Sequence, residues 1–137
     1  MANDAIASNL LVKERSQQLR QFLLVGHTFG LYQNDYTPTV ASTWANLVEC
    51  SFPGYHRIST AGRLSVPSKV LDGKYQFNSD TLTVICTAPT NEKAYGWFLA
   101  DGFLVKFTGR FDLPFDLGTG IAVTWAVTLQ EWALSIL

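Results

Sequence analysis

The pattern of apolar and polar positions along the chain changes its period near residue 26. Between residues 5 and 25 the apolar side chains recur every three or four residues, as on one face of an α-helix. Gly26 follows at the usual position of a helix C-cap. We therefore expect one amphipathic helix over residues 5–25. The apolar residues of its face are Ile6, Leu10, Leu11, Leu19, Phe22 and Leu23.

After the helix, apolar and polar residues alternate with a period of two, which is typical of β-strands with one buried face. This alternation predicts strands at 29–33, 55–60 and 82–88 and, most regular of all, at 121–130. A long polar loop follows the first of these strands. Within it, apolar residues at spacings of three and four predict a single helical turn inside 41–49.

Two hairpins are expected in the second half of the chain. The first joins residues 75–77 to 82–88 through a polar turn. The second joins 92–100 to 103–107 through an Asp-Gly pair at 101–102, and Asp-Gly between β-rich segments is among the strongest local signals for a tight hairpin.

Short strands about ten residues apart, joined by turns and not by helices, indicate an antiparallel β-sandwich. At 137 residues the chain has the size of one domain. We therefore predict a mainly β fold in a single domain, residues 1–137, in which the helix at 5–25 precedes a jelly-roll-like β-sandwich at 29–137. The residues expected to face its core are Leu82, Val84, Cys86, Tyr95, Trp97, Val123, Trp125 and Val127.

Composition narrows the classes of function. Apolar residues make up 47% of the chain and charged residues only 15%, which excludes a disordered protein. A net charge of −1 offers no basic field, so we expect no nucleic-acid partner. Neither a membrane-spanning run nor a secretory leader is recognisable, so we expect synthesis in a cytoplasm and no membrane association. With so few charges to repel another copy, part of the apolar surface is expected to contact another subunit.

Residues that could carry catalysis or bind a metal are few and scattered. His27 and His56 lie outside any nucleophile motif, and we interpret them as capping or surface residues. Asp112 and Asp116 flank a proline, which favours turn chemistry over acid–base catalysis or calcium binding. We therefore predict no catalytic residue, no cofactor and no metal site.

The pattern of cysteines and aromatic residues favours core packing over ligand binding. Cys50 and Cys86 lack zinc-ligand spacing, and in a reducing compartment we expect buried thiols more than a disulfide. An aromatic group in the second half could form a platform that stacks on sugars, although alternation turns at least half of its members inward. This group comprises Tyr95, Trp97, Phe98, Phe103, Phe107 and Phe111.

The last residues of the sequence are apolar and keep a period of two. The segment is expected either to pair as a final strand or to dock on a neighbouring subunit. Burying its large side chains would contribute roughly 1.5 to 3 kcal/mol each. We predict that residues 132–137 take part in contacts between subunits or with a shell. The candidate interface residues are Trp132, Leu134, Ile136 and Leu137.

Four strings of the sequence resemble a family of small proteins encoded among the virion structural genes of tailed bacteriophages. They are LYQNDYTPT at 31–39, FPGY at 52–55, YGWFLAD at 95–101 and RFD at 110–112. In order and spacing the resemblance covers most of residues 10–130. The sequence departs from the family at Trp97, where a tyrosine is more usual, and in its longer aromatic end.

The resemblance implies a non-enzymatic virion component. Combined with a weakly charged β domain, it suggests a capsid decoration or cement protein that contacts the major capsid protein and other copies of itself. We expect a homo-oligomer, a trimer in view of the threefold positions of capsid shells, that is made in the host cytoplasm and located in the virion. The alternatives are a tail, neck or fibre component, or a carbohydrate-binding or adhesin module.

Overall fold

The computed structural model describes residues 2–71 and 74–132, and its contacts divide the chain into two compact units. The first unit combines residues 1–25, 61–81 and 126–137, and the second combines 26–60 and 82–125. The fold is mainly β, with antiparallel sheets and an N-terminal helix. The mainly β class and the N-terminal helix are thereby confirmed.

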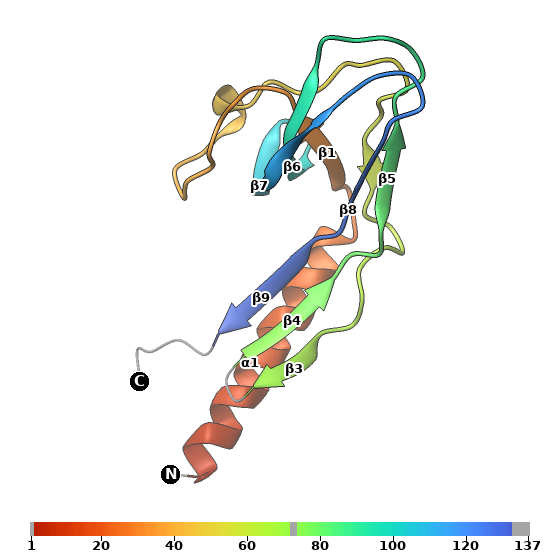
Figure 1. Ribbon diagram of the computed structural model, residues 1–137. Helices are drawn as coiled ribbons and strands as arrows, with labels where there is room; N and C mark the ends of the chain where they lie inside the picture. Colours follow the sequence, from red (N-terminus) through yellow and green to blue (C-terminus); the bar gives the residue numbers. More distant parts are fainter. Residues whose placement is uncertain (1, 72–73, 133–137) are drawn as a thin grey trace. The chain divides into compact units, whose positions relative to one another are not determined.

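The first unit packs one helix against a three-stranded sheet. Helix α1 (Ala2–Leu23) lies along the antiparallel strands β4 (Lys74–Asn78) and β9 (Thr128–Trp132), as Figure 1 shows. Strand β3 (Ser68–Leu71) completes the sheet on the far side of β4, in the order β3-β4-β9. The helix therefore covers the central strand and one edge of this sheet.

The buried face of α1 differs in part from the expected apolar face: Leu23 is buried as expected, whereas Leu11 and Phe22 have 60% and 54% of their surface exposed. Val12, Ser16 and Leu23 are fully buried, and they stand four and seven residues apart on one side of the helix. In the last turns, the Arg20 guanidinium donates two hydrogen bonds to the Leu64 carbonyl oxygen, at 3.1 and 2.9 Å from Nε and Nη2. These contacts fix the helix to the segment that leads into the sheet.

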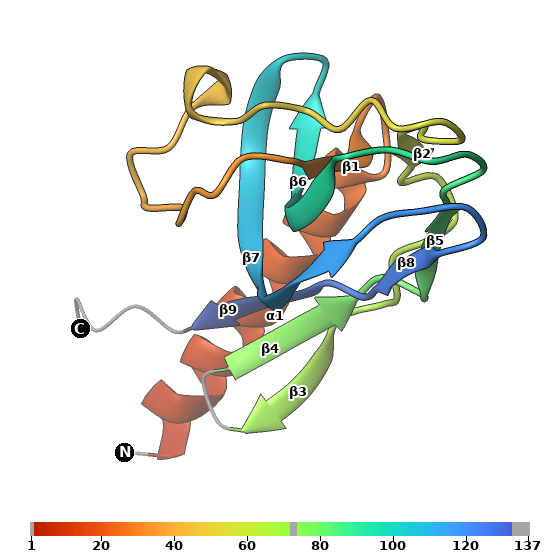
Figure 2. The ribbon, with the colours of Figure 1, turned by 45° about the horizontal axis from the view of Figure 1, so that its top comes forward.

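The second unit is built on a four-stranded antiparallel sheet (Figure 2). Its order is β2-β1-β6-β7, with β2 at Ile58–Ser59, β1 at Thr28–Tyr32, β6 at Lys93–Asp101 and β7 at Leu104–Asp116. The hairpin expected at the Asp-Gly pair is confirmed, because β6 and β7 are joined there and Gly102 has a φ of +57°. Only glycine adopts such a φ readily, so this residue permits the tight turn.

A two-stranded sheet and a short helical turn complete the second unit. Strand β5 (Leu82–Ile85) pairs with β8 (Ala122–Trp125). The helical turn predicted within 41–49 is confirmed as the 3-10 helix η1, Trp44–Asn46. One core cluster of this unit includes buried residues of β1, of β6 and of the loop that carries η1. Its buried members are Tyr32, Leu47, Phe98 and Ala100, with Tyr36, Trp44, Tyr95 and Val105 packed around them.

Two strand predictions are wrong. Residues 75–77 and 82–88 form no hairpin, because β4 pairs with β3 and β9 whereas β5 pairs with β8. The residues between them do not form the expected turn but pair with a distant segment. Ser79 donates its backbone N–H to the Val127 carbonyl oxygen at 2.8 Å, and its Oγ accepts the Val127 N–H. The same tie divides the strand expected at 121–130 into β8 and β9.

The expected buried face is confirmed at 82–86 and 123–127 and is wrong in β6. Tyr95 and Trp97 are only half-buried, whereas Ala94, Gly96 and Phe98 are buried. The reason lies at Gly96, where a Cβ would overlap the Tyr32 ring. The Tyr32 ring occupies the space that a side chain at position 96 would fill, so the face of β6 that carries Gly96 turns toward the core. The other expected core residues are buried, namely Leu82, Val84, Cys86, Val123, Trp125 and Val127.

Candidate functional site

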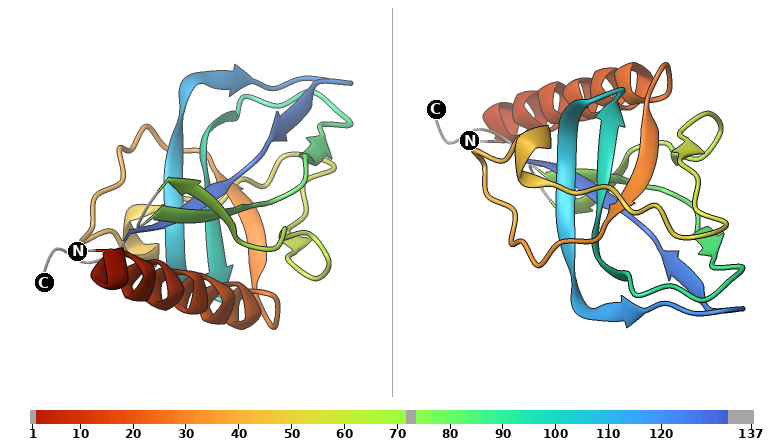
Figure 3. Two further views of the ribbon diagram at one scale, coloured as in Figure 1. Left: turned by 90° about the horizontal axis from the view of Figure 1, so that it is seen from below. Right: turned by 90° about the horizontal axis from the view of Figure 1, so that it is seen from above.

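Strand β7 forms an open edge of the sheet of the second unit, within the part of the chain that the structure describes. Figure 3 (right) shows it beside β6, on the side away from β1. All 13 residues of β7 are exposed or half-buried. Leu104 and Leu113 have 60% and 80% of their surface exposed. A strand that pairs on one side only presents alternate backbone N–H and C=O groups to whatever lies beside it.

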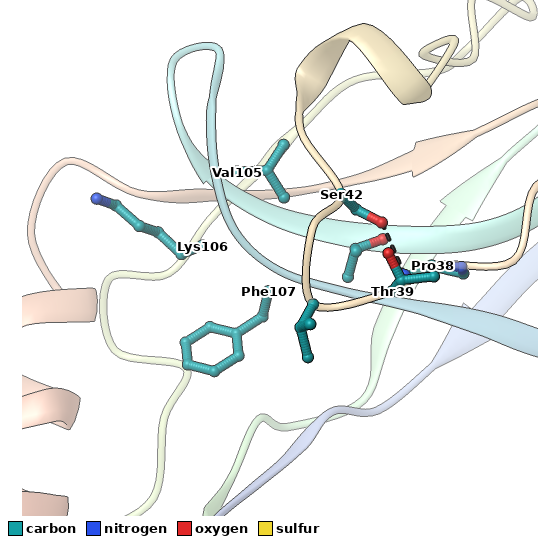
Figure 4. Close-up of a pocket in the computed structure, with 8 residues that line it drawn as sticks. Pro38, Thr39, Ser42, Val105, Lys106 and Phe107 are labelled. Atoms are coloured by element: carbon teal, nitrogen blue, oxygen red, sulfur yellow. Dashed lines mark hydrogen bonds between the residues drawn. The ribbon is translucent and has the colours of Figure 1, made fainter.

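A groove of about 580 Å³ runs beside the first half of β7. One wall is the loop at 38–42, and the other is formed by four consecutive residues, 105–108 (Figure 4). Successive side chains of a strand point to opposite faces. In β7 this alternation is interrupted at Lys106, because Leu99 pairs with Phe107 and Ala100 with Val105, so that Lys106 is the extra residue of a bulge. The residues lining the groove are Pro38, Thr39, Val40, Ser42, Val105, Lys106, Phe107 and Thr108.

The loop wall of the groove is held in place by its own hydrogen bonds. The Ser42 Oγ accepts the backbone N–H of Thr39 at 2.8 Å and lies 2.6 Å from the Tyr36 hydroxyl. The Tyr32 hydroxyl in turn donates to the Tyr36 carbonyl oxygen at 3.0 Å, and burial raises the pKa of Tyr32 to about 12. The wall is thus tied to the core strand β1. A binding partner would meet a preformed surface, which lowers the entropy cost of binding.

Arg57 and Glu49, here called the arginine clamp, hold the turn of the β6–β7 hairpin next to the groove. Arg57 makes a two-pronged contact with the Glu49 carboxylate, at 2.8 Å from Nε and 3.0 Å from Nη2, and these hydrogen bonds raise the pKa of Arg57. Its Nη1 donates to the Gly102 carbonyl oxygen at 2.6 Å. The Arg57 guanidinium also lies over the Trp44 and Phe103 rings, at 5.2 and 5.8 Å from their centres. Charge-assisted and cation–π contacts together hold the hairpin turn against the η1 loop.

The Tyr55 hydroxyl links this clamp to β1. It donates to the Glu49 carboxylate at 2.6 Å and accepts the Leu31 backbone N–H at 3.1 Å. Burial raises the pKa of Tyr55, and the hydrogen bond to Glu49 raises it further. A Cβ on Gly30 would collide with the Tyr55 hydroxyl and with the Phe98 ring. Tyr55, the tyrosine of the FPGY string, therefore fits in this place only because residue 30 of β1 is a glycine.

The strings that carry the family resemblance meet in the second unit. Arg110 of RFD makes an ion pair of 2.6 Å with Asp35 of LYQNDYTPT and lies over the Tyr95 ring at 5.4 Å. Tyr32 of the same long string covers Gly96 of YGWFLAD. Most of these contacts lie inside the sheet or at its rim. The strings thus encode the packing of the unit that presents the groove.

The histidines and aspartates considered for catalysis do not come together. His27 is buried, so the expectation of a surface position is wrong for this histidine, whereas His56 is exposed. The His27 backbone carbonyl accepts the Thr60 N–H and hydroxyl, which holds this residue inside the unit. Asp112 and Asp116 lie within β7 and not in a turn, and Asp116 pairs with Lys93 at 3.2 Å.

The cysteines and the aromatic group do not form a binding site either. Cys50 and Cys86 are both buried and free, and burial raises the pKa of the Cys50 thiol, assisted by the charges of Glu92 and Glu49. Phe98 is fully buried, while Phe103 has 71% of its surface exposed at the hairpin turn. The remaining aromatic residues considered as a platform are half-buried: Tyr95, Trp97, Phe107 and Phe111.

Of the candidate interface residues, the structure places the backbone of one. Trp132 is the last residue of β9 and pairs with Lys74 of β4. Leu134, Ile136 and Leu137 lie outside the described residues. The prediction that this segment makes contacts between subunits stays a prediction.

Sequence reasoning missed the groove and the clamp. Pro114 offered one signal, since proline inside a strand is confined to sheet edges and bulges. The aspartates that flank it predicted a turn, and β7 instead continues to Asp116. The pairing of Glu49 with Arg57 and the meeting of 38–42 with 105–108 have no local signature.

No protein-family model matches the chain, and neither curated proteins nor solved structures provide a match. Within residues 2–71 and 74–132, no three or more histidine, cysteine or acidic side chains come together as metal ligands. None of the helices described there has the length and apolar character needed to cross a membrane. The groove beside β7 is the feature of the described surface on which a functional argument can be built.

Proposed function

We propose that the chain is a non-enzymatic virion structural protein, a capsid decoration or cement protein that contacts the major capsid protein and other copies of itself. The observation that carries this proposal is the open edge of β7 with its preformed groove. A protein that works through contacts needs rigid, exposed backbone and apolar surface, and β7 offers both.

Two further observations support the proposal. The strings that resemble the phage virion family lie where they build the unit carrying the groove, so the resemblance extends to the residues that shape this surface. The low charge of the chain, with a net value of −1, reduces repulsion between copies on a crowded shell. The threefold oligomer and the face-to-face packing of sheets in a jelly-roll-like sandwich belong to the same proposal.

The proposal is tested by locating the chain on purified particles. We expect gold-labelled antibodies against the chain to decorate the shell, in proportion to the number of capsid subunits. Particles made without the chain should assemble and then release their contents at a lower temperature than complete particles. Label confined to the tail or neck, or absent from particles, would overturn the decoration role.

A matched pair of variants relates this role to the groove. Val40 lines the groove and is fully exposed, whereas Val66 is an exposed valine of the first unit. We expect Val40→Asp to reduce the amount of chain on particles, because a charge would have to be buried in the contact. Val66→Asp is the control and should leave this amount unchanged. Equal particle binding of both variants would separate the groove from the shell contact.

A further inference from the structure

We propose that the groove beside β7 receives residues 133–137 of a second copy of the chain, which add to β7 as an extra strand. This inference rests on the proposed function in one respect, that the protein works as one of many copies in an assembly. It assigns the groove an occupant, and it gives the terminal segment a place to bind.

The shape of the groove favours an extended peptide. It follows β7 over Val105–Thr108, where β6 is the one strand of the described chain that pairs with it. Unpaired backbone groups at such an edge bind an added strand through main-chain hydrogen bonds, and pockets beside the edge take alternate side chains. The loop at 38–42 limits the width of the groove on the opposite side. A single extended segment therefore suits this space better than a folded sheet edge.

The lining of the groove matches the chemistry of the terminal segment. Val40, Val105 and Phe107 supply apolar surface, while Thr39, Ser42 and Thr108 supply hydroxyl groups. In Figure 4 the Lys106 and Phe107 side chains both extend to the left, away from the loop residues Thr39 and Ser42. The segment ALSIL at 133–137 offers Leu134 and Ile136 on one side and Ala133, Ser135 and Leu137 on the other. Alternate apolar residues are what an added strand presents to one face of a sheet.

The length of the segment is also suitable. The last described strand, β9, ends at Trp132, and five residues follow it. Extended, five residues span about 17 Å, which is enough to pair with the four groove residues of β7. Leu134 and Ile136 would then be covered by the groove of the neighbour, and the exposed Val40 would be covered by the segment.

The experiment uses full-length protein carrying single added cysteines. Chains with Val40→Cys are mixed with chains carrying Ile136→Cys, and the mixture is oxidised mildly. We expect a covalent dimer of the two different chains, with a disulfide between positions 40 and 136 identified by peptide mass spectrometry. Replacing the first variant by Val66→Cys gives the matched control, for which we expect at least about tenfold less dimer, equivalent to about 1.4 kcal/mol of preference.

Synthetic peptides then test strand addition itself. An excess of the peptide EWALSIL should suppress the dimer, and a scrambled peptide should not. Two N-methylated versions, one blocked at alanine and serine and the other at leucine and isoleucine, separate backbone pairing from simple apolar contact. Since an added strand turns alternate N–H groups toward its neighbour, we expect one version to lose its effect and the other to keep it.

The outcomes that overturn the inference are equally defined. Equal dimer yields with Val40→Cys and Val66→Cys, or no dimer at all, would remove the groove as the binding site. A chain carrying both Val40→Cys and Ile136→Cys that closes only on itself would show that the occupant is its own segment. Equal competition by both N-methylated peptides would exclude strand addition. All these measurements are made without particles, so their failure leaves the shell location to be judged by antibody labelling.

Discussion

Strands β6 and β7 are hydrogen-bonded neighbours in one sheet, but β6 is buried in the core and β7 is exposed at the edge. Along β6 the side chains of Ala94, Phe98, Leu99 and Ala100 are fully buried, and the strand is paired on both sides. Along β7 all residues are exposed or half-buried, and pairing within the described chain occurs on one side only. The difference shows that position in the sheet decides the role of each strand, because both are rich in aromatic and apolar residues. One strand holds the unit together and the other is available for contact.

The largest effect that sharpens this comparison is expected from a matched pair of phenylalanines. Phe98 of β6 is fully buried, and Phe107 lies one register position away on β7 and is half-buried. Phe98→Ala should lower the free energy of unfolding by about 3 to 5 kcal/mol, because it leaves a cavity in the core. Phe107→Ala should lower it by about 1 kcal/mol. Denaturant titration measures both values, and equal losses would break the distinction between the strands.

Alkaline pH tests the core side of β6 through Tyr32. The pKa of Tyr32 is raised from 10.0 to about 12, because the buried ring disfavours the phenolate. The stabilisation is complete below pH 10 and is lost as the pH rises from about 10 to about 12, where the unfolded chain ionises first. We expect a loss of up to about 3 kcal/mol over this range, measured by unfolding at fixed pH values. Tyr32→Phe should flatten this part of the profile, and an unchanged slope would contradict the assignment.

Adding a methyl group to glycine probes the two strands at neighbouring positions. A Cβ at Gly96 of β6 would overlap the Tyr32 ring and the Gly109 carbonyl oxygen, which belong to the core and to backbone. Gly96→Ala should therefore cost about 1 to 3 kcal/mol of stability. At Gly109 of β7 a Cβ would meet only the half-buried Trp97 side chain, which has room to shift. Thermal melts of both variants should rank Gly96→Ala as the less stable protein.

The smallest expected effect belongs to the exposed side of β7. Leu113 has 80% of its surface exposed, so Leu113→Ser should change the free energy of unfolding by no more than about 0.5 kcal/mol. Denaturant titration beside the parent chain checks this expectation. A loss as large as that of Phe98→Ala would mean that β7 is part of the core after all.

Local sequence signals predicted the elements well and their partners less well. The helix, strand β1, the 3-10 turn and the Asp-Gly hairpin each depend on residues close in sequence, and all are found in the structure. The hairpin expected between 75–77 and 82–88 failed because Ser79 bonds to Val127, which lies 48 residues away. The buried face of β6 failed because Gly96 lets Tyr32 approach from another strand.

The candidate site could not be predicted from the sequence for a related reason. Its two walls, residues 38–42 and 105–108, are more than 60 positions apart, and neither carries a motif that predicts the other. The clamp between Glu49 and Arg57 is local in sequence, yet its value comes from the Gly102 carbonyl oxygen of a distant hairpin. Alternation identifies which side chains turn inward, but not which strand is left at the edge of a sheet.

The irregular second half of β7 has a consequence for aggregation. Gly96 pairs with Arg110 and Ala94 with Phe115, so four β7 residues, 111–114, bulge out opposite Tyr95. One of them is Pro114, which has no N–H to give to a further strand. An open strand of this length would otherwise be a template for endless stacking of chains, as in amyloid fibres. Together with the one-residue bulge at Lys106, this larger bulge interrupts regular pairing along β7, so that growth along this edge is limited to one short added segment.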